Sequence, residues 1–487
     1  MYYSDTYETQ DINMEKFTTQ DIEQIINHKL TIETVQQQIS DFENGFPFIN
    51  IVSAAVTGDG ILQISDTKYA EFYDNNKNRY KIEKFVPASG AATRMFKDLF
   101  EFLNTGIANK TTQTVLDNLT KFAFYNDLKQ ILPQNATSQD IIRCIIDKSG
   151  LNYGNLPKGL LKFHNNNENG ITAVAEHLCE GAQYAESNGI VNIHFTVSPE
   201  HISVFSELLD KIVPQYESDF GVKYHINLST QKPETDTIAV NIDNTPFRDT
   251  DNNLLFRPAG HGALIENLND IDSDIIFIKN IDNVCTTDTR NDTILYKKIL
   301  AGIAIQIQQQ IFKYINDIDS DNANISEIKD YISNNLGIRN FATTEIRNIL
   351  NRPLRICGMI KNTGAPGGGP FWTKNSDGSE SLQIIEPGQI APESASILHQ
   401  GQYFNPVDLV CMTRDYMGNK FDLTQYIDKS TGFISTKSKN GRDLRAMERP
   451  GLWNGAMSKW NTIFVEVPTT TFTPAKVVTD LLNDGHK

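Results

Sequence analysis

The segment VPASGAATRM, residues 86–95, has the composition of a turn that binds an anion. Gly90 permits close approach of the backbone, and Arg94 is expected in the first turn of a following helix, where it could make a bidentate contact. Unpaired N–H groups and the positive end of that helix would favour a phosphate. The residues of this predicted phosphate turn are Ser89, Gly90, Ala91, Ala92 and Thr93. An ordinary strand-to-helix turn is the alternative, because neither G-K-[ST] nor G-x-G-x-x-G is present.

Three later segments carry residue types that suit the same chemistry. Lys158 follows a proline in LPKGLLKFH, which makes it a candidate for a fixed cation rather than a solvent-facing lysine. Gly260, His261 and Gly262 precede an apolar helix in FRPAGHGALIENL, where a slim turn could pack against a flat ring or simply begin the helix. Asp282 ends a buried strand in IKNIDNV, and ligands of open parallel sheets gather at the carboxyl ends of strands. A carboxylate there is well placed for Mg²⁺.

The C-terminal half contains weaker candidates. The stretch GAPGGGPFWT, which begins at Gly364, could form an anion nest, a lid or a tight structural turn. Lys361 precedes it and would face the same pocket. Lys459 in WNGAMSKW is a further candidate cation, with a surface lysine as the alternative.

These residues need a scaffold, and the apolar pattern predicts one. Short apolar runs alternate with helical periodicity from Lys81 onward, and DIIFIKNID holds an unbroken apolar run typical of a strand covered on both faces. This order predicts an α/β fold with a Rossmann-like, mixed but mainly parallel sheet. Thr18 or Thr19 and Thr31 are expected to cap two N-terminal helices. We expect an N-terminal helical region at 1–80, a nucleotide-binding core at 81–300, and a helical connection with a C-terminal α+β portion at 301–487.

Composition excludes several classes of protein. The formal net charge of −16 argues against nucleic acid as a partner. The five cysteines contain no C-x-x-C pair, which disfavours a zinc knot or a disulfide framework. No apolar run long enough for a membrane span is present, so a cytoplasmic protein without a membrane partner is expected.

In their order, the phosphate turn with Thr-Arg, the Pro-Lys, the G-x-G before a helix and the I-D-N after a strand resemble sugar nucleotidyltransferases, in particular UDP-sugar pyrophosphorylases with a glycosyltransferase-A-like core. The resemblance covers residues 80–290. The whole chain, including GMIKNTGAPGGGPFW and RPGLWNGAMSKWNTIFVEVP, is also similar to a bacterial family named only as domain of unknown function 4301.

The resemblance implies transfer of a nucleotidyl group from a nucleoside triphosphate to a sugar 1-phosphate. The phosphate turn and Arg94 would hold the β- and γ-phosphates, and Lys158 would pair with the reacting phosphate. Mg²⁺ would bind Asp282 and Asp408, the latter because a second metal ligand comes late in the superfamily's chain.

The 260–262 turn and Gln231 would face the base. Two alternatives stay open: a glycosyltransferase that consumes a nucleotide sugar, and a nucleotide-binding protein without turnover. The second is favoured by Ala91 and Ala92, whose methyl groups stand where the superfamily has glycines and would narrow the phosphate bed.

Overall fold

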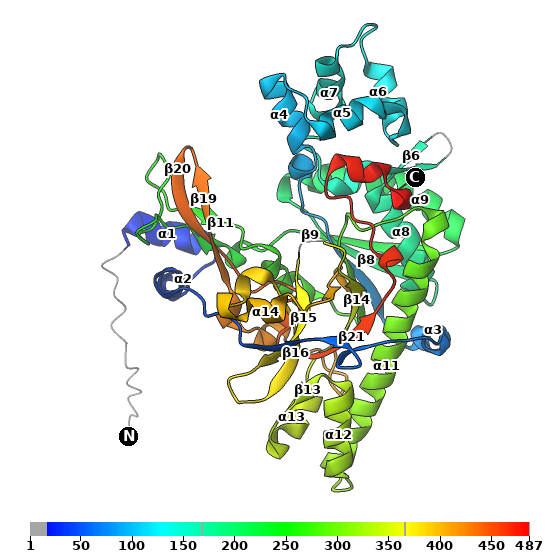
Figure 1. Cartoon of the computed structure of the whole chain (residues 1–487), viewed down its shortest axis with the longest axis vertical. Coiled ribbons are helices and arrows are strands. Elements are labelled where there is room, and N and C mark those ends of the chain that lie inside the picture. Colours follow the sequence, from blue (N-terminus) through cyan, green and yellow to red (C-terminus); the bar gives the residue numbers. More distant parts are fainter. Residues whose placement is uncertain (1–16, 167–168, 365–366, 487) are drawn as a thin grey trace, which may run out of the picture.

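The structure of the chain, a computed structural model, describes residues 17–166, 169–364 and 367–486 (Figure 1). Its centre is an eleven-stranded sheet. In sheet order the strands are β2 (Val56–Thr57), β3 (Gly60–Leu62), β21 (Asn461–Glu466), β14 (Leu354–Lys361), β18 (Asp408–Met412), β12 (Ile275–Lys279), β4 (Ile82–Pro87), β8 (Ile190–Thr196) and β7 (Glu186–Ser187), with β9 (Lys223–Ser229) also paired to β8 and β17 (Tyr403–Phe404) to β14.

The pairing confirms the predicted α/β class with a mixed, mainly parallel sheet. Strands β12, β4, β8 and β9 run parallel to one another. Strand β18 runs antiparallel to β12 and β14, and β14 is parallel to β21. The carboxyl ends of the parallel strands therefore meet at one edge of the sheet.

Strand β12 shows why the sheet is covered on both faces. Its five residues are all buried, and alternate side chains of a strand point to opposite faces. Ile275 and Phe277 pack with α11 (Asn291–Asp319) and α3 (Lys68–Asn76). Ile276 and Ile278 pack with α10 (Ile265–Asp270) and with a second sheet. That sheet has the order β1 (Ile51–Ala54), β15 (Gly369–Lys374), β16 (Glu380–Ile385), β13 (Ile338–Arg339).

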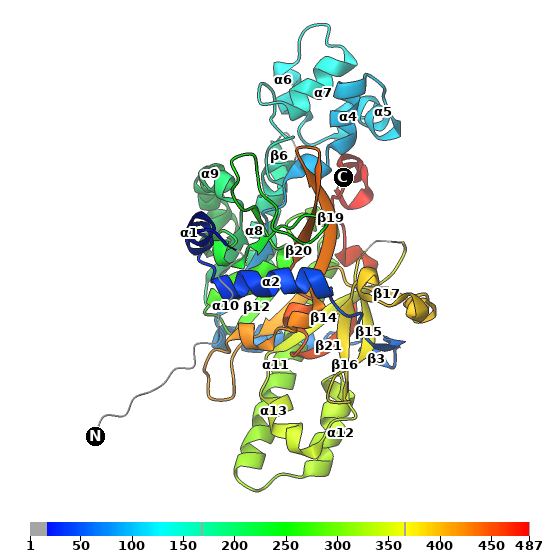
Figure 2. The ribbon, with the colours of Figure 1, turned by 90° about the vertical axis from the view of Figure 1, so that its left-hand side faces the viewer.

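The remaining elements form outlying layers (Figures 1 and 2). Helices α4 (Lys97–Thr105), α5 (Lys110–Asp117), α6 (Tyr125–Ile131) and α7 (Ser138–Ile146) make a small lobe at one end of the molecule. Beside β8 and β9 lie α8 (Ala173–Tyr184), α9 (Ile202–Phe220) and the hairpin β5 (Lys162–Asn166) and β6 (Asn169–Thr172). Helices α12 (Ile325–Asn335) and α13 (Ile346–Leu350) lie at the opposite end, and α14 (Ala395–Leu398) lies near β1.

The two expected N-terminal helices are confirmed. Helix α1 (Thr19–Asn27) is capped by Thr18 in a capping box, and α2 (Ile32–Asn44) by Thr31. Both pack against β10 (Thr237–Ile238), β11 (Phe256–Arg257) and the hairpin β19 (Phe433–Lys439) and β20 (Arg442–Glu448), through a core that contains Val35, Phe42 and Met447.

The expected domain boundaries do not match the structure. The region 1–80 is not only helical, because residues 51–62 form strands of both sheets. The boundary at residue 300 falls inside α11. Ile303 and Ile311 of this helix pack in one cluster with Ile82 and Phe277 from before the boundary and Ile356 from after it. Strands β14, β18 and β21 complete the central sheet, so residues 81–300 do not form a separate core.

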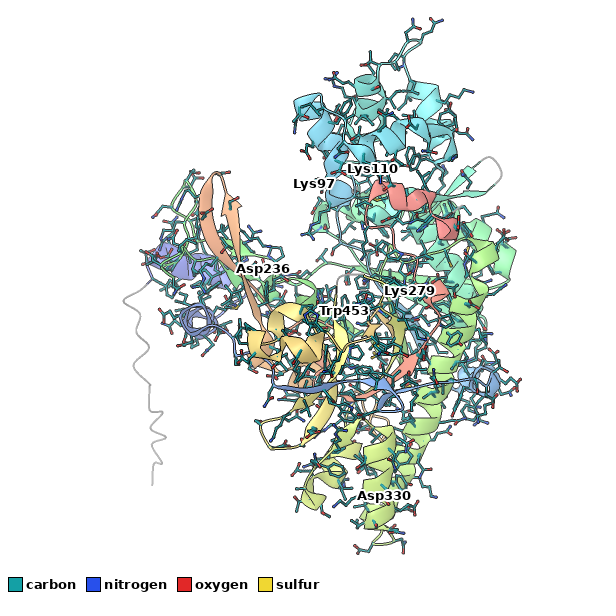
Figure 3. All side chains as sticks on the ribbon, in the orientation of Figure 1. Lys97, Lys110, Asp236, Lys279, Asp330 and Trp453 are labelled. Atoms are coloured by element: carbon teal, nitrogen blue, oxygen red, sulfur yellow. The ribbon has the colours of Figure 1, made fainter. Side chains whose placement is uncertain are left out.

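A buried ion cluster ties the central strands to the helices. The Glu180 carboxylate of α8 accepts from Lys84 Nζ of β4 at 3.0 Å and from Lys279 Nζ of β12 at 2.7 Å (Figure 3 labels Lys279). All three side chains are at most 1% exposed. Burial lowers the pKa of Lys84 to about 7. Burial opposes ionisation of Glu180 as well, yet the two lysines hold its pKa well below its usual range.

Replacing Glu180 by alanine should destabilise the fold strongly. The substitution leaves Lys84 and Lys279 buried without their counter-ion, which typically costs about 3–5 kcal/mol. The matched control is Asp74→Ala, which breaks a part-exposed pair with Lys298 (3.0 Å) and should cost about 1 kcal/mol or less. Urea unfolding followed by circular dichroism measures both. Equal midpoints for the two variants would contradict a structural role for the cluster.

Candidate functional site

The predicted phosphate turn lies at the carboxyl edge of the sheet, directly after β4. It is fixed to neighbouring segments on both sides: Ala88 N donates to Thr196 O at 2.8 Å, Ala92 N to Leu156 O at 3.1 Å, and Lys158 N to Gly90 O at 3.3 Å. Within the part of the chain that the structure describes, the backbone N–H groups of the intervening residues Ser89, Gly90 and Ala91 have no hydrogen-bond partner. A rigid turn with three unpaired donors is a surface suited to an anion.

The two alanines of the turn face different ways. Ala92 is fully buried and packs in the core with Met95, so its methyl group does not narrow the anion surface. Ala91 is exposed, and its φ of −66° is one that any residue adopts. A Cβ added at Gly90 would meet no atom within 4 Å. Space therefore lies open over this part of the turn.

Arg94 lies beside the turn, although not in the helix that we expected. Residues Ala92–Arg94 form a separate short 3-10 turn, and α4 begins only at Lys97. The anion surface thus depends on the turn itself and on Arg94 rather than on the end of a helix. The Arg94 guanidinium is exposed and makes no hydrogen bond or ion pair with any residue that the structure describes.

The Pro-Lys segment and the strand end come together at the same edge. Lys158 Nζ donates to Asp282 Oδ2 at 2.7 Å and to the Ala475 carbonyl at 2.8 Å. Since the Lys158 backbone also bonds Gly90, the phosphate turn, Lys158 and Asp282 form one continuous arrangement. Asp282 is 6% exposed. Its carboxylate is therefore a largely buried group that positions the ammonium of Lys158.

A second lysine reaches Asp282 from the C-terminal segment, which the sequence patterns did not single out. Lys476 Nζ lies 3.7 Å from Asp282 Oδ2, and its side chain is 59% exposed. The local sequence, Pro474-Ala475-Lys476, lacks the Pro-Lys pair that drew attention to Lys158, so it gave no comparable signal. Two lysines thus contact the Asp282 carboxylate, and Arg94 follows the phosphate turn nearby in the chain.

The predicted metal ligands differ in their availability. Asp408 is 2% exposed and ion-paired with Lys297, which itself is buried, so a metal could reach it only by breaking that pair. No group of three or more His, Cys, Asp or Glu side chains suited to a metal is found among the described residues. Asp282 is the more exposed of the two, at 6%, but its Oδ2 is already paired with Lys158 at 2.7 Å.

The 260–262 turn is packed more tightly than we expected. The His261 ring stacks on Trp453 with centroids 4.1 Å apart, and a Cβ at Gly262 would lie 2.1 Å from Pro450 O. The ring face of His261 is thus filled by the protein's own tryptophan. Gln231 donates to Asp236 at 3.2 Å.

The two lysine candidates of the C-terminal half lie at different edges of the sheet, Lys361 at the carboxyl edge and Lys459 at the amino edge. Lys361 ends β14 and pairs with Glu466 at 3.6 Å. Lys459 precedes β21, so it lies at the opposite edge of the sheet, where it lines a cavity of about 630 Å³. Parallel strands carry their amino ends to the edge away from Asp282, which the local sequence around Lys459 could not reveal. Of the glycine-rich stretch, Ala365 and Pro366 lie outside the described residues.

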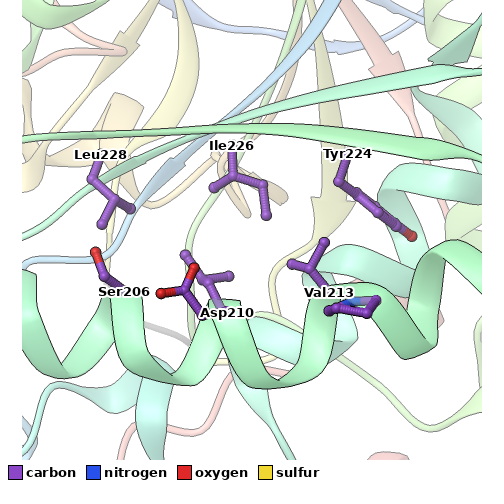
Figure 4. Close-up of a pocket in the computed structure, with 8 residues that line it drawn as sticks. Ser206, Asp210, Val213, Tyr224, Ile226 and Leu228 are labelled. Atoms are coloured by element: carbon purple, nitrogen blue, oxygen red, sulfur yellow. The ribbon is translucent and has the colours of Figure 1, made fainter.

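A further groove of about 310 Å³ lies between α9 and β9 and is lined by Ser206, Tyr224 and Ile226, among others (Figure 4). None of the predicted site residues lines it.

Among the described residues, every helix is too short or too polar to span a membrane.

The sequence profile of DUF4301, a domain of unknown function, matches residues 18–487. The chain belongs to the DUF4301 family. No curated protein matches it. A mutant of UDP-glucose pyrophosphorylase from Leishmania major is similar in structure, with 14% identity, a TM-score of 0.48, and coverage of 95% of this chain and 77% of the other. The UDP-N-acetylglucosamine pyrophosphorylase of Trypanosoma brucei has 10% identity, a TM-score of 0.48, and coverage of 97% and 83%. At these values the similarities do not assign an activity to the DUF4301 chain.

The open space over the phosphate turn of this DUF4301 protein can be tested by measuring the stability of glycine variants. In Gly90→Ala the added methyl group would meet no atom within 4 Å, so we expect the free energy of unfolding to change by no more than about 0.5 kcal/mol. Gly262→Ala is the matched comparison, because its new Cβ would clash with the Pro450 carbonyl and overpacking typically costs about 1–3 kcal/mol. Thermal unfolding measures both. A large loss in Gly90→Ala would mean that the turn is closed.

The packing of His261 predicts a pH-dependent stability. Burial lowers its pKa to about 4, and its Nδ1 accepts from Leu452 N at 3.0 Å. An unfolded histidine titrates near pH 6.5. Between about pH 6.5 and 4 the unfolded chain therefore binds a proton that the folded chain does not, so stability falls as the pH falls.

In His261→Phe the unfolded chain no longer binds this extra proton. The slope of the unfolding free energy against pH should therefore decrease by up to about 1.4 kcal/mol per pH unit. Urea unfolding at pH 4.5, 5.5 and 7 measures the slope, with His225→Phe, at an exposed position, as the control. An unchanged slope in His261→Phe would contradict the assignment.

Proposed function

We propose that the protein transfers a nucleotidyl group from a nucleoside triphosphate to a sugar 1-phosphate and releases pyrophosphate. The observation that carries this proposal is the contact of Lys158 and Lys476 with the Asp282 carboxylate. It lies beside a turn that is followed by Arg94 and has three N–H donors without a partner among the described residues. Three cations and three N–H groups exceed what one phosphate needs. Their number suits the several phosphates of a triphosphate and a sugar 1-phosphate together.

In the proposed reaction the protein positions groups and balances charge. An oxygen of the sugar 1-phosphate attacks the α-phosphorus, one P–O bond forms, and the bond from that phosphorus to the oxygen bridging to the β-phosphate breaks. Pyrophosphate leaves from the opposite side. No proton needs to move, so no general base is required, and orientation with charge neutralisation supplies the acceleration.

Each cation has a distinct proposed role. The turn 89–91 and Arg94 hold the β- and γ-phosphates, where the leaving pyrophosphate gains charge. Lys158 is fixed by Asp282 and the Ala475 carbonyl, which suits it to hold the reacting phosphate in one orientation. Lys476 is more exposed and turns from Asp282 to a substrate oxygen when a phosphate enters.

Mg²⁺ is proposed to bind Asp282, where it would neutralise phosphate charge. Asp408 is not included, because it is buried in the core with Lys297, whereas Asp282 lies among the residues that are proposed to hold the phosphates. The nucleobase is proposed to lie toward Gln231 and the 260–262 turn. Asn267 of α10 supports this, since it donates to Thr230 O at 2.8 Å and so joins the helix after the turn to the end of β9.

The test is a screen for pyrophosphate release from the four nucleoside triphosphates with sugar 1-phosphates and Mg²⁺. For the active pair we expect Arg94→Ala and Asp282→Asn to lower kcat/KM by about 10²–10³-fold, as the loss of a transition-state contact does. Lys459→Ala is the control, because this lysine lies at the other edge of the sheet.

Far-UV circular dichroism and thermal unfolding of each variant separate a lost contact from a lost fold. Retained turnover in Arg94→Ala and in Asp282→Asn would refute the site. Nucleotide binding by calorimetry, without product, would indicate a binding protein instead.

A further inference from the structure

The C-terminal segment, residues 473–486, is fixed to the candidate site along its whole length. Its first part runs beside the residues that follow Asp282: Thr473 N donates to Asn283 Oδ1 at 2.9 Å, and Ala475 N donates to Asp282 O at 3.0 Å. Val478 N then donates to Met95 O at 3.1 Å, next to Arg94. The segment thus spans the site from the strand end to the phosphate turn.

The turn that carries Lys476 is closed by hydrogen bonds within the segment. Asp480 Oδ2 accepts from the backbone N–H groups of Lys476 and Val477 at 2.7 and 2.8 Å. Ala475, Val478 and Leu481 bury their side chains in the core beneath the phosphate turn. The backbone position of Lys476 is therefore well defined, and its side chain is 59% exposed beside Asp282.

The far end of the segment is held by a buried pair of histidine rings. His486 Nδ1 lies 2.7 Å from His164 Nε2, and His164 Nδ1 lies 2.6 Å from Glu176 Oε1. The two rings are 3% and 1% exposed. Glu176 is also ion-paired with Arg290, and Gly485 O accepts from Thr286 N at 3.1 Å.

The charges assign the protons in this chain of contacts. Glu176 is the acceptor for His164 Nδ1–H, so a neutral His164 presents the lone pair of Nε2, and His486 Nδ1–H donates to it. Burial lowers the pKa of His486 to about 4, which keeps this ring neutral at neutral pH. The His486 ring thus donates a hydrogen bond from Nδ1 to His164 Nε2, whose orientation Glu176 fixes.

We propose that His486 is a positioning residue: by anchoring the C-terminal segment to His164, it holds the Lys476 backbone in place for binding a substrate phosphate. The proposal rests on the proposed function for the identity of that phosphate. The anchor itself does not, because it is a property of the unliganded chain. The C-terminal segment is thus held at its far end by His486, which lies ten residues beyond Lys476.

The first test reads the anchor directly, by amide hydrogen exchange on the full chain. His486→Ala should raise the exchange rate of the 473–484 amides at least about tenfold and leave those of β12 unchanged. His486→Gln restores a donor and should exchange close to the wild type. His194→Ala is the matched control, because it removes another buried ring hydrogen bond, to Ser229 at 2.6 Å, away from the segment. Unchanged exchange in His486→Ala would overturn the proposal.

The second test links the anchor to Lys476 through a double-mutant cycle with inorganic pyrophosphate as the probe. By calorimetry, we expect Lys476→Met and His486→Ala each to weaken binding about 5–50-fold, and the double variant to be no weaker than Lys476→Met alone. A purely structural loss would instead add to the effect of Lys476→Met. Additive losses, or wild-type affinity in His486→Ala, would overturn the positioning role.

The outcomes also separate this proposal from the proposed function. If both tests succeed but no nucleoside triphosphate yields pyrophosphate, the nucleotidyl transfer fails and the anchor stands. If turnover is found and His486→Ala keeps the wild-type kcat and KM, the anchor role fails and the transfer stands. Absence of pyrophosphate binding by the wild-type chain would overturn the link to Lys476.

Discussion

The buried Glu180 carboxylate is the constraint on which the rest of the structure depends. It is shared by Lys84 in β4 and Lys279 in β12, two neighbouring parallel strands, so the strands and α8 are held by one charge network inside the core. Both strands lead directly to the candidate site: β4 into the phosphate turn and β12 into Asp282. Because a buried charge tolerates little displacement of its partners, the network fixes the spacing of the two strand ends.

A second buried ion pair joins the antiparallel strand β18 to the same core. Asp408 begins β18 and is neutralised by Lys297 of α11, and Lys297 also donates to the Ile278 carbonyl of β12 at 3.2 Å. The resemblance to sugar nucleotidyltransferases made Asp408 a metal ligand. Its surroundings instead make it a counter-ion that joins β18 and β12 to α11.

Local patterns predicted the parts of the site that follow from strand ends. A buried apolar run ending at Asp282 and a small-residue turn after β4 are local features, and parallel strands bring such ends to one edge. The arrangement of Lys158 on Asp282 was only partly predictable, since the Pro-Lys pattern suggests a fixed cation but not its partner. The contribution of Lys476 depends on a tertiary docking that no local pattern encodes. Lys459 lies at the other edge of the sheet, because its local sequence does not determine at which edge of the sheet the residue lies.

The phosphate turn accommodates alanine at two positions where the sugar nucleotidyltransferase pattern has glycine. Alanine at position 92 points into the core and alanine at 91 has an ordinary backbone conformation, so neither position requires glycine. The charge balance of the site supports the same conclusion. Lys158 and Lys476 share one carboxylate, and Arg94 has no counter-ion among the described residues.

In a chain with a net charge of −16, such a local excess of positive charge has an electrostatic cost before any ligand binds, since the cations repel one another. An entering phosphate removes that repulsion. Part of the binding free energy of a phosphate therefore comes from relief of this repulsion, and the backbone hydrogen bonds of the C-terminal segment keep Lys476 beside Asp282.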